Sequence, residues 1–206
     1  MARRPAYTRL GVDERRQRLL ALGADVFTRH AYDELSMAAI AREAGISKAL
    51  LYHYFPSKQA FFQATLEQAA QELAERVRPA DGLPPAEQLT HSLDAFLGWI
   101  EENETAYRKL MQSVASVSEA RELVDRVRHD TADLILAGLT GGDAPPPELR
   151  TAVRGWLWFM DGVCLEWLER RDMERPQVIG LLLGTLLGAV TAAGEAGALT
   201  EPTAGL

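Results

Sequence analysis

Between residues 47 and 58 the sequence gathers side chains that can bind a polyanion and recognise hydrogen-bonding groups. Lys48 and Lys58 carry positive charge, and the hydroxyls of Ser47 and Tyr52 and the ring of His53 can donate hydrogen bonds. Groups of these kinds bind phosphate oxygens and the edges of nucleic-acid bases. The residue types therefore favour contact with DNA over chemical catalysis.

The sequence contains no recognisable catalytic constellation. Its four histidines are scattered over different segments, without the H-x3-H spacing that holds a metal on one helical face. The single cysteine, Cys164, lies in an apolar stretch and excludes both an internal disulfide and a cysteine zinc site. Glycine-rich phosphate loops, nucleophile elbows and dinucleotide fingerprints are missing. We expect no enzyme activity, no metal and no cofactor, although an all-helical enzyme built from distant residues stays an alternative.

Positive charge is concentrated at one end of the chain. Residues 1–58 hold ten Lys and Arg against six Asp and Glu, a net charge of +4, so the other 148 residues carry −11 of the formal total of −7. A basic end on an acidic body can dock on phosphates while the rest avoids non-specific contact. The N-terminal basic residues are followed by no apolar run, so we expect a cytoplasmic protein and no secretory signal.

The elements that must position these side chains are helical throughout, with no sustained alternation of apolar and polar residues. Asp13, Ser36, Ser47 and Ser57 are predicted N-caps, Gly45 a left-handed C-terminal residue, and Pro56 a stop. The expected fold is all-α with about nine helices, over approximately 13–30, 36–44, 48–55, 57–78, 86–101, 104–116, 119–139, 148–171 and 175–196. The predicted domains are 1–58 and 59–206.

The segment 36–55 is predicted to form a helix-turn-helix. Two short helices flank the turn at Gly45, and alanines lie where the helices must cross closely. The second helix presents a basic and aromatic face, while Leu51 and Phe55 point toward a core. A short helix of this kind fits the major groove of DNA. A structural helical hairpin with a basic face arising by chance is the alternative.

This segment resembles the DNA-binding domain of the TetR family of bacterial transcriptional regulators. The resemblance is carried by the alanine-glycine turn, the Leu-Tyr-x-x-Phe run at 51–55 and the Ser-Lys pair that opens the fourth helix, and it is strong over about residues 10–65. Beyond that, only the number and length of the helices and the final helix pair are similar. The likeness implies an N-terminal three-helix domain joined by a long fourth helix to a helical domain for dimerisation and ligand binding.

The resemblance also implies roles for individual residues. Lys48 falls where family members read a base, and Tyr52 where they contact a phosphate or a thymine methyl. Tyr54 and Lys58 fall at phosphate contacts. Leu50 departs from the Thr or Ser frequent at its position, which puts direct readout there in doubt. An N-terminal arm is expected to reach the minor groove. The expected DNA-binding set is Arg3, Arg4, Ser36, Ser47, Lys48, Ala49, Leu50, Tyr52, His53, Tyr54 and Lys58.

The last two helices are expected to pair with those of a second copy. Residues 176–194 are uncharged and apolar, which also fits a membrane span, but the stretch is only just long enough and no basic or aromatic belt frames it. We expect a water-soluble four-helix dimer interface and no membrane. The close approach of helices there is assigned to Gly155, Gly162, Gly180, Gly184 and Gly188.

The family likeness further implies a ligand cavity in the middle of the C-terminal domain. For each single residue, ordinary core packing is the alternative, and Asp161 is expected to pair with an arginine or a backbone amide. Aromatic lining suggests an apolar or aromatic effector. The candidate residues are Phe96, Trp99, Asn103, Tyr107, Met111, Gln112, His129, Trp156, Phe159, Met160, Asp161 and Trp167.

The sequence therefore predicts a homodimeric repressor that leaves a palindromic double-stranded DNA operator when a small molecule binds. Two recognition helices are required because half-sites lie about 34–36 Å apart. An activator or an effector-independent DNA binder on the same scaffold is the alternative, and a helical adaptor or membrane-associated protein is the alternative from another class.

Overall fold

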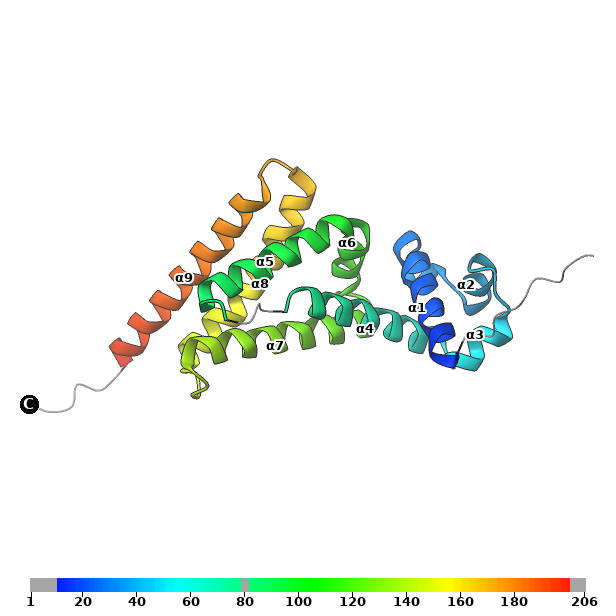
Figure 1. The fold of residues 1–206 in the computed structure, drawn as a ribbon, viewed down its shortest axis with the longest axis horizontal. Coiled ribbons are helices and arrows are strands. Elements are labelled where there is room, and N and C mark those ends of the chain that lie inside the picture. Colours follow the sequence, from blue (N-terminus) through cyan, green and yellow to red (C-terminus); the bar gives the residue numbers. More distant parts are fainter. Residues whose placement is uncertain (1–10, 79–81, 201–206) are drawn as a thin grey trace, which may run out of the picture. The chain divides into compact units, whose positions relative to one another are not determined.

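The computed structural model describes residues 11–78 and 82–200, with 195–200 as helix only (Figure 1). Arg3 and Arg4 lie outside the described residues. Regular structure over these ranges is entirely helical, which confirms the expected all-α fold. The helices are α1 (Val12–Arg29), α2 (Met37–Glu43), α3 (Lys48–Tyr54), α4 (Lys58–Arg76), α5 (Pro85–Glu102), α6 (Glu104–Ser113), α7 (Ser118–Thr140), α8 (Pro147–Arg170) and α9 (Arg175–Thr200), with a 3-10 turn, η1 (Tyr32–Glu34), between α1 and α2.

The ends of the short helices follow from local chemistry. Ser36 and Ser47 cap α2 and α3, because their hydroxyl oxygens accept the backbone N–H of Ala39 and Leu50, each at 3.1 Å. Gly45 has φ of +66°, the left-handed conformation that a turn after a helix requires. The Asp13 cap is wrong: Gly11 is the N-cap residue of α1 without a side-chain cap, and Asp13 lies in the first helical turn.

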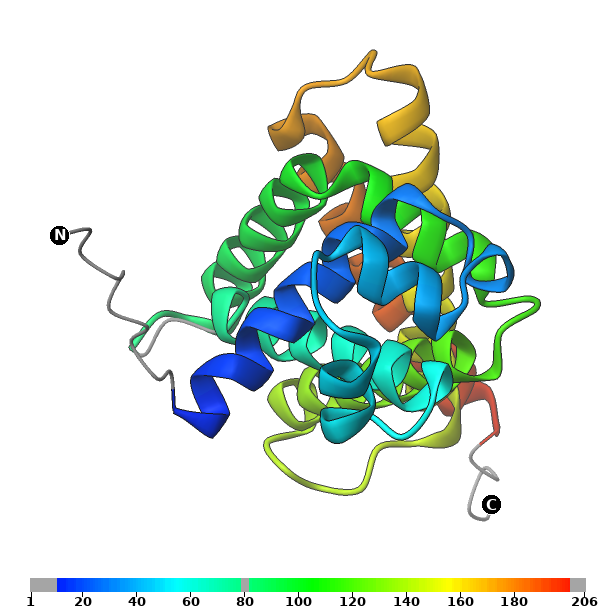
Figure 2. The same cartoon turned by 90° about the vertical axis from the view of Figure 1, so that its right-hand side faces the viewer.

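Residues from all four N-terminal helices, whose ribbons face the viewer in Figure 2, form one small core. Apolar positions of α1 meet those of α2, α3 and the beginning of α4, and this fixes the helix-turn-helix on a rigid base. A methyl group on Gly23 of α1 would lie 2.6 Å from both Phe61 Cζ and Thr65 Oγ1 of α4, so the two helices touch there. The core residues are Leu19, Leu20, Val26, Leu35, Met37, Ile40, Ala41, Leu51, Phe55 and Phe61.

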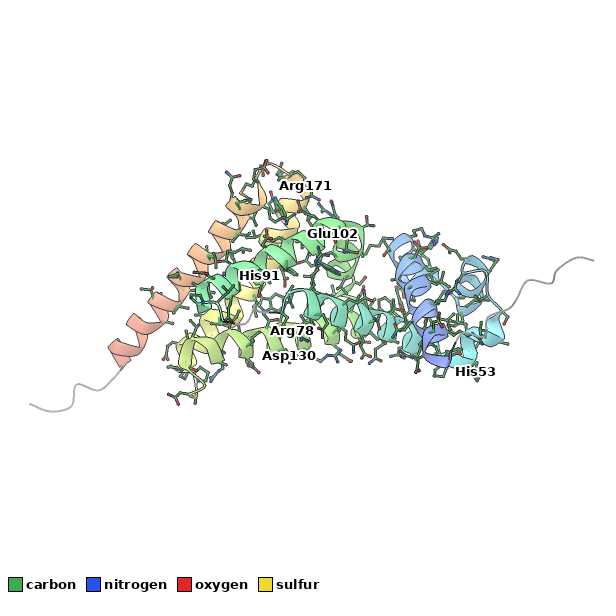
Figure 3. The ribbon with its side chains drawn as sticks, viewed as in Figure 1. His53, Arg78, His91, Glu102, Asp130 and Arg171 are labelled. Carbon is green, nitrogen blue, oxygen red and sulfur yellow. The ribbon has the colours of Figure 1, made fainter. Side chains whose placement is uncertain are left out.

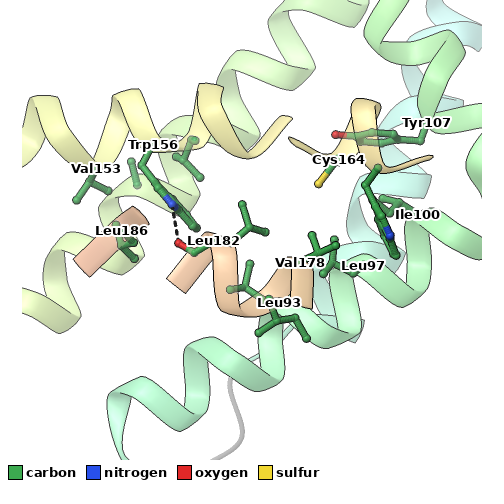
Figure 4. Packing of buried hydrophobic residues seen from close by; sticks show 14 of the residues in the cluster. Leu93, Leu97, Ile100, Tyr107, Val153, Trp156, Cys164, Val178, Leu182 and Leu186 are labelled. Carbon is green, nitrogen blue, oxygen red and sulfur yellow. Dashed lines mark hydrogen bonds between the residues drawn. The ribbon is translucent and has the colours of Figure 1, made fainter. Parts of the chain in front are cut away.

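A second, larger core lies among α5 to α9 (Figure 4). Leu93 and Leu97 of α5 pack with Val178 and Leu182 of α9, and α8 lies against both α7 and α9. The indole N–H of Trp156 on α8 donates to the Leu182 carbonyl at 3.0 Å, drawn as the dashed line in Figure 4. This bond satisfies a buried polar group inside an otherwise apolar interface.

The chain forms two compact units that meet at Ala70 and Gln71, inside α4. The prediction placed the domain boundary twelve residues earlier, at the beginning of this helix. The first turns of α4 belong with the N-terminal unit because Phe61, Phe62 and Thr65 are buried there.

One described helix is long and apolar enough to cross a membrane. It is the segment Arg175–Gly194 of α9, with a mean hydropathy of 1.7, and 28% of it is buried inside the chain. Val178, Ile179, Leu182 and Leu186 form its buried side. A core helix of a soluble protein meets the same criteria of length and composition, so these features alone are weak evidence for a membrane span.

Candidate nucleic-acid interface

The helix α3 exposes one face and buries the other. Ser47, Lys48, Ala49, Tyr52 and His53 are exposed, with Tyr52 at 44% of its full accessible surface. His53 is labelled on α3 in Figure 3. On the opposite side Leu51 and the C-cap residue Phe55 are fully buried in the N-terminal core. The helix is thus anchored by two apolar side chains, and the face predicted to meet DNA is presented to solvent.

Two pairs of neighbouring side chains are in contact on α3. The ammonium of Lys48 lies 5.5 Å from the centre of the Tyr52 ring, and the His53 ring meets Tyr54 edge-on at 5.1 Å. Leu50 and Tyr54 are half-buried. Lys48 and Tyr52 each carry a hydrogen-bond donor, so one of them can donate to a base edge while the other donates to a phosphate. The geometry gives α3 the donors that a DNA reader needs.

Lys58 is held differently from Lys48. Its ammonium donates to the backbone carbonyl of Tyr32 at 2.9 Å and lies 4.0 Å from the centre of the Tyr32 ring. Lys58 is the first residue of α4. Ser57 caps this helix, because its hydroxyl oxygen accepts the backbone N–H of Ala60 at 3.0 Å. Lys58 is half-buried, so its predicted phosphate contact would come from a side chain that already has partners within the protein.

Further basic groups surround the helix-turn-helix. The guanidinium of Arg16 on α1 lies 5.5 Å from the centre of the Phe55 ring at the end of α3, which places an exposed positive charge next to the recognition helix. Arg29 bridges Asp25 at 2.6 Å and also Glu43 of α2, and His30 contacts Glu43 at 3.0 Å. Arg29 is therefore largely neutralised, whereas Arg16 adds to the positive surface.

The candidate effector residues separate into interior and exposed groups. Phe96 and Tyr107 meet edge-on at 6.2 Å, and Trp99, Met111 and Met160 pack against the same C-terminal core. Gln112, His129 and Phe159 are exposed and do not join this interior group.

Three other candidates serve the scaffold through hydrogen bonds to the backbone. The indole N–H of Trp167 donates to the Met173 carbonyl at 2.8 Å, and Trp156 donates to α9 as described above. Asn103 lies at the end of α5, and its amide donates to the Trp99 carbonyl at 2.9 Å. These contacts give the three side chains a structural role without any ligand.

Asp161 lies in a partly buried polar cluster. Its Oδ2 accepts Nη2 and Nε of Arg128 on α7 at 2.7 and 2.8 Å, and its Oδ1 accepts the Tyr107 hydroxyl at 3.3 Å. This confirms the expected arginine partner. Burial raises the pKa of the Asp161 carboxyl even though Arg128 opposes that shift, and burial also raises the pKa of Tyr107. The Arg128 guanidinium in turn lies 3.8 Å from the centre of the Trp158 ring.

A surface pocket of about 460 Å³ lies between α5 and the turn that joins α8 to α9. Ion pairs form part of its wall: Glu101 binds Arg175 at 2.6 Å and Arg171, labelled in Figure 3, at 3.2 Å. Arg171 also has φ of 52° at the end of α8. Of the predicted effector residues only Trp167 lines this pocket.

The two units match known protein families. Residues 19–65 match the model of bacterial regulatory proteins of the tetR family, and residues 85–189, half of the chain, match the tetracyclin repressor-like C-terminal domain. A tetR-family transcriptional regulator from Streptomyces coelicolor is similar in structure, with 31% identity and a TM-score of 0.78, over 91% of this chain and 85% of that one. This chain belongs to the tetR family of bacterial regulators.

Two further relatives bear on what this tetR-family chain does. The HTH-type transcriptional activator FasR of Mycolicibacterium smegmatis is 34% identical over 107 residues, 51% of this chain and 49% of FasR, so the match spans about half of that relative's length. The FadR repressor of Thermus thermophilus, solved with lauroyl-CoA, shares the fold with a TM-score of 0.61 and 20% identity, over 84% of this chain and 94% of that one. The family consists of transcriptional regulators and not of enzymes.

The glycines assigned to the dimer interface of this tetR-family chain face open space. A methyl group added to Gly155, Gly162, Gly180, Gly184 or Gly188 would meet no atom of the chain within 4 Å. Large apolar side chains are exposed on the same two helices: Trp158 and Phe159 on α8, and Leu181 and Leu187 on α9. The small residues are thus not needed for packing within one subunit.

Sequence reasoning missed Arg16, Tyr32, Arg128 and Trp158. Each contacts a partner that is distant in the chain or on another helix, so the spacing of residues in the sequence could not predict the contact. Lys58 and Tyr32 are 26 residues apart, and Arg128 and Asp161 are 33 residues apart. The only available signal was chemical: an aspartate within an apolar run, such as Asp161, needs a cation or another polar partner.

Proposed function

We propose that this chain is a sequence-specific DNA-binding transcriptional regulator that acts as a homodimer on a palindromic operator. The observation that carries the proposal is the exposed face of α3, where Ser47, Lys48, Tyr52 and His53 face solvent while Leu51 and Phe55 anchor the helix. A capped helix held in this way can enter the major groove without rearrangement.

The exposed apolar surface of α8 and α9 supports the homodimer. Trp158 is 61% exposed and Leu187 64%, and the neighbouring glycines leave room for a second backbone. A water-soluble protein rarely leaves an apolar face of this kind uncovered. In a symmetric pair, the same surface of each copy covers the other, and two α3 helices become available for two half-sites. On this proposal α9 is a dimer helix of a cytoplasmic protein and not a membrane span.

We propose further that a small apolar or aromatic molecule bound in the C-terminal unit releases the operator, as a repressor requires. Phe96, Trp99, Met111 and Met160 pack there against the core that includes the buried Tyr107. The FadR relative, solved with lauroyl-CoA, supports a ligand that carries an apolar chain. Any such ligand must bind the DNA-free state more tightly, with a coupling of roughly 1–3 kcal/mol. Similarity to FasR, named an activator, favours activation as the second candidate.

Selection of bound fragments from genomic DNA, followed by gel shifts over a range of salt concentrations, tests DNA binding. A regulator should bind a palindrome with affinity that falls steeply as salt rises, because phosphate contacts release counterions. An adaptor or membrane-associated protein should show neither a palindrome nor a steep salt dependence. Adding candidate ligands to the same complex then distinguishes release from enhanced binding.

Lys48→Ala is the sharpest single change. We expect it to alter base preference at one position of each half-site by roughly 1–3 kcal/mol, because a base contact is lost. Lys109→Ala, which removes the same charge from α6 in the C-terminal unit, is the matched control and should leave preference unchanged. If Lys48→Ala binds the same sequences in the same order, Lys48 does not read a base.

A further inference from the structure

Lys58 is fixed by two contacts to one residue. Its ammonium is 2.9 Å from the carbonyl oxygen of Tyr32 and 4.0 Å from the centre of that residue's ring. The carbonyl attracts the ammonium as a hydrogen-bond acceptor, and the ring attracts it through its negative face. The two contacts restrict the direction in which the four-carbon stem of Lys58 can point. Lys48, whose ammonium is 5.5 Å from the Tyr52 ring centre, is exposed and held less closely.

Tyr32 is itself held in place by aromatic neighbours from two helices. Its ring centre lies 4.8 Å from that of Phe62 on α4 and 6.4 Å from that of Phe27 on α1, and Phe27 and Phe62 meet edge-on at 4.7 Å. Phe62 is buried. The platform beneath Lys58 is therefore built from the same packing that holds α1 against α4, and it forms with the folded domain.

A lysine held in this way can still bind a phosphate. An ammonium has three donors, and the Tyr32 carbonyl takes one of them. Lys58 also stays half-exposed at the first residue of α4. A free lysine loses much side-chain entropy when it is immobilised on a phosphate, and a lysine already ordered by its own protein loses less.

We propose that Tyr32 is a positioning residue for DNA binding: through its carbonyl and ring it orients the Lys58 ammonium toward a backbone phosphate beside the major groove. This inference rests on the proposed function. Tyr32 needs no contact with DNA itself, and its contribution passes entirely through Lys58.

A double-mutant cycle tests the proposal. Tyr32→Leu, Lys58→Met and the double variant are compared by gel shift on a selected operator at several salt concentrations. Lys58→Met should weaken binding to all sequences similarly and reduce the salt slope by about one per subunit. Tyr32→Leu removes the ring contact and keeps the backbone carbonyl, so Lys58 is held by one contact in place of two and binding should weaken about two- to tenfold per subunit. In the Lys58→Met background, Tyr32→Leu should have no further effect on affinity.

Two further variants separate positioning from folding. Tyr32→Phe keeps the ring that Tyr32→Leu removes and should retain wild-type affinity. Phe27→Leu removes another ring of the same platform without touching Lys58, so it should lower the thermal midpoint more than it lowers affinity. All affinities are measured where circular dichroism shows every variant folded.

Each result bears on the proposal. Losses from Tyr32→Leu and Lys58→Met that multiply in the double variant would overturn it, and so would a Lys58→Met protein that binds DNA normally. If the unmodified protein binds no duplex, the proposed function fails and the positioning role fails with it. If the unmodified protein binds and the two losses multiply, only the role of Tyr32 fails.

Discussion

At the scale of single residues, burial decides which groups can react. Cys164 lies one turn after Asp161 on α8, within the C-terminal core. Desolvation and the nearby Asp161 charge raise the pKa of the Cys164 thiol to about 12. A thiol in these surroundings stays protonated at neutral pH, and only the thiolate is a nucleophile. Cys164 is therefore a packing residue.

We expect Cys164 to resist modification while the protein is folded. With a pKa of about 12, about one thiol in ten thousand is ionised at pH 8, and the sulfur is also covered by its neighbours. Labelling with a chromogenic disulfide reagent at pH 8 should be slow, and it should become fast in concentrated urea. Rapid stoichiometric labelling of the folded protein would show that α8 opens at this position.

At the scale of helices, the N-terminal unit depends on one close approach. Gly23 lets α1 lie directly on Phe61 and Thr65 of α4. Both neighbours are buried and have little room to move. The position therefore requires the absence of a side chain, although glycine is a poor helix former.

Gly23→Ala should destabilise the protein by about 1–3 kcal/mol, because the strain of overpacking exceeds the gain in helix propensity. Gly138→Ala on α7 is the matched control: the position is exposed, nothing lies within 4 Å of an added methyl group, and the change should stabilise by up to about 1 kcal/mol. Urea unfolding followed by circular dichroism measures both. Equal midpoints for the two variants would contradict the close approach.

Loss of the N-cap of α3 should also destabilise a single helix. Ser47→Ala removes the acceptor for the Leu50 N–H and should cost about 1 kcal/mol of stability. DNA affinity should fall with it, because the first turn of α3 frays. Ser57→Ala, which removes the equivalent cap from α4, is the comparison at a site outside the recognition helix. Lower affinity for Ser57→Ala than for Ser47→Ala would contradict the greater importance of α3.

The helices could be predicted because caps and turn residues act on their neighbours in the chain. The contacts between helices could not be predicted in this way. Ser36, Gly45 and Ser47 act on their own neighbours, so the predicted helix-turn-helix agrees closely with the observed one. At the start of α1, Asp13 has the right chemistry for a cap, but the helix begins earlier and Gly11 takes that place. Predicting a helix gives its residue range, but it does not say which other helix packs against each of its faces.

The candidate sites show the same division. The exposed face of α3 could be predicted because Leu51 and Phe55 define the buried face by spacing alone. The candidate pocket could not, since His129 and Phe159 lie on helices with several possible inward faces, and the structure exposes both. The Lys58 contact with Tyr32 depends on the tertiary position of the short 3-10 turn η1, which has no periodic apolar pattern from which it could be predicted.

At the scale of the whole molecule, the proposed dimer depends on the apolar side chains that α8 and α9 expose. A second copy would cover Leu181 and Leu187, and water would otherwise surround them. The length and hydropathy of α9 fit this dimer role as well as they fit a membrane span.

Leu187→Glu should convert the proposed dimer to a monomer, because a carboxylate would be buried without a partner. Leu134→Glu on α7 is the matched control, since Leu134 is 59% exposed, close to the 64% of Leu187, but lies outside the α8 and α9 surface. Sedimentation velocity of both variants measures the oligomeric state. A dimeric Leu187→Glu protein would remove α9 from the proposed interface, and binding of the unmodified protein to lipid vesicles would favour the membrane alternative.

One arginine connects the outside of the C-terminal unit with its interior. The flat guanidinium of Arg128 supports the exposed indole of Trp158 and at the same time neutralises the covered carboxylate of Asp161. The side chain that holds the exposed indole in place is therefore the same one that balances the charge of Asp161, so the packing of Trp158 and the ion pair depend on one position of Arg128.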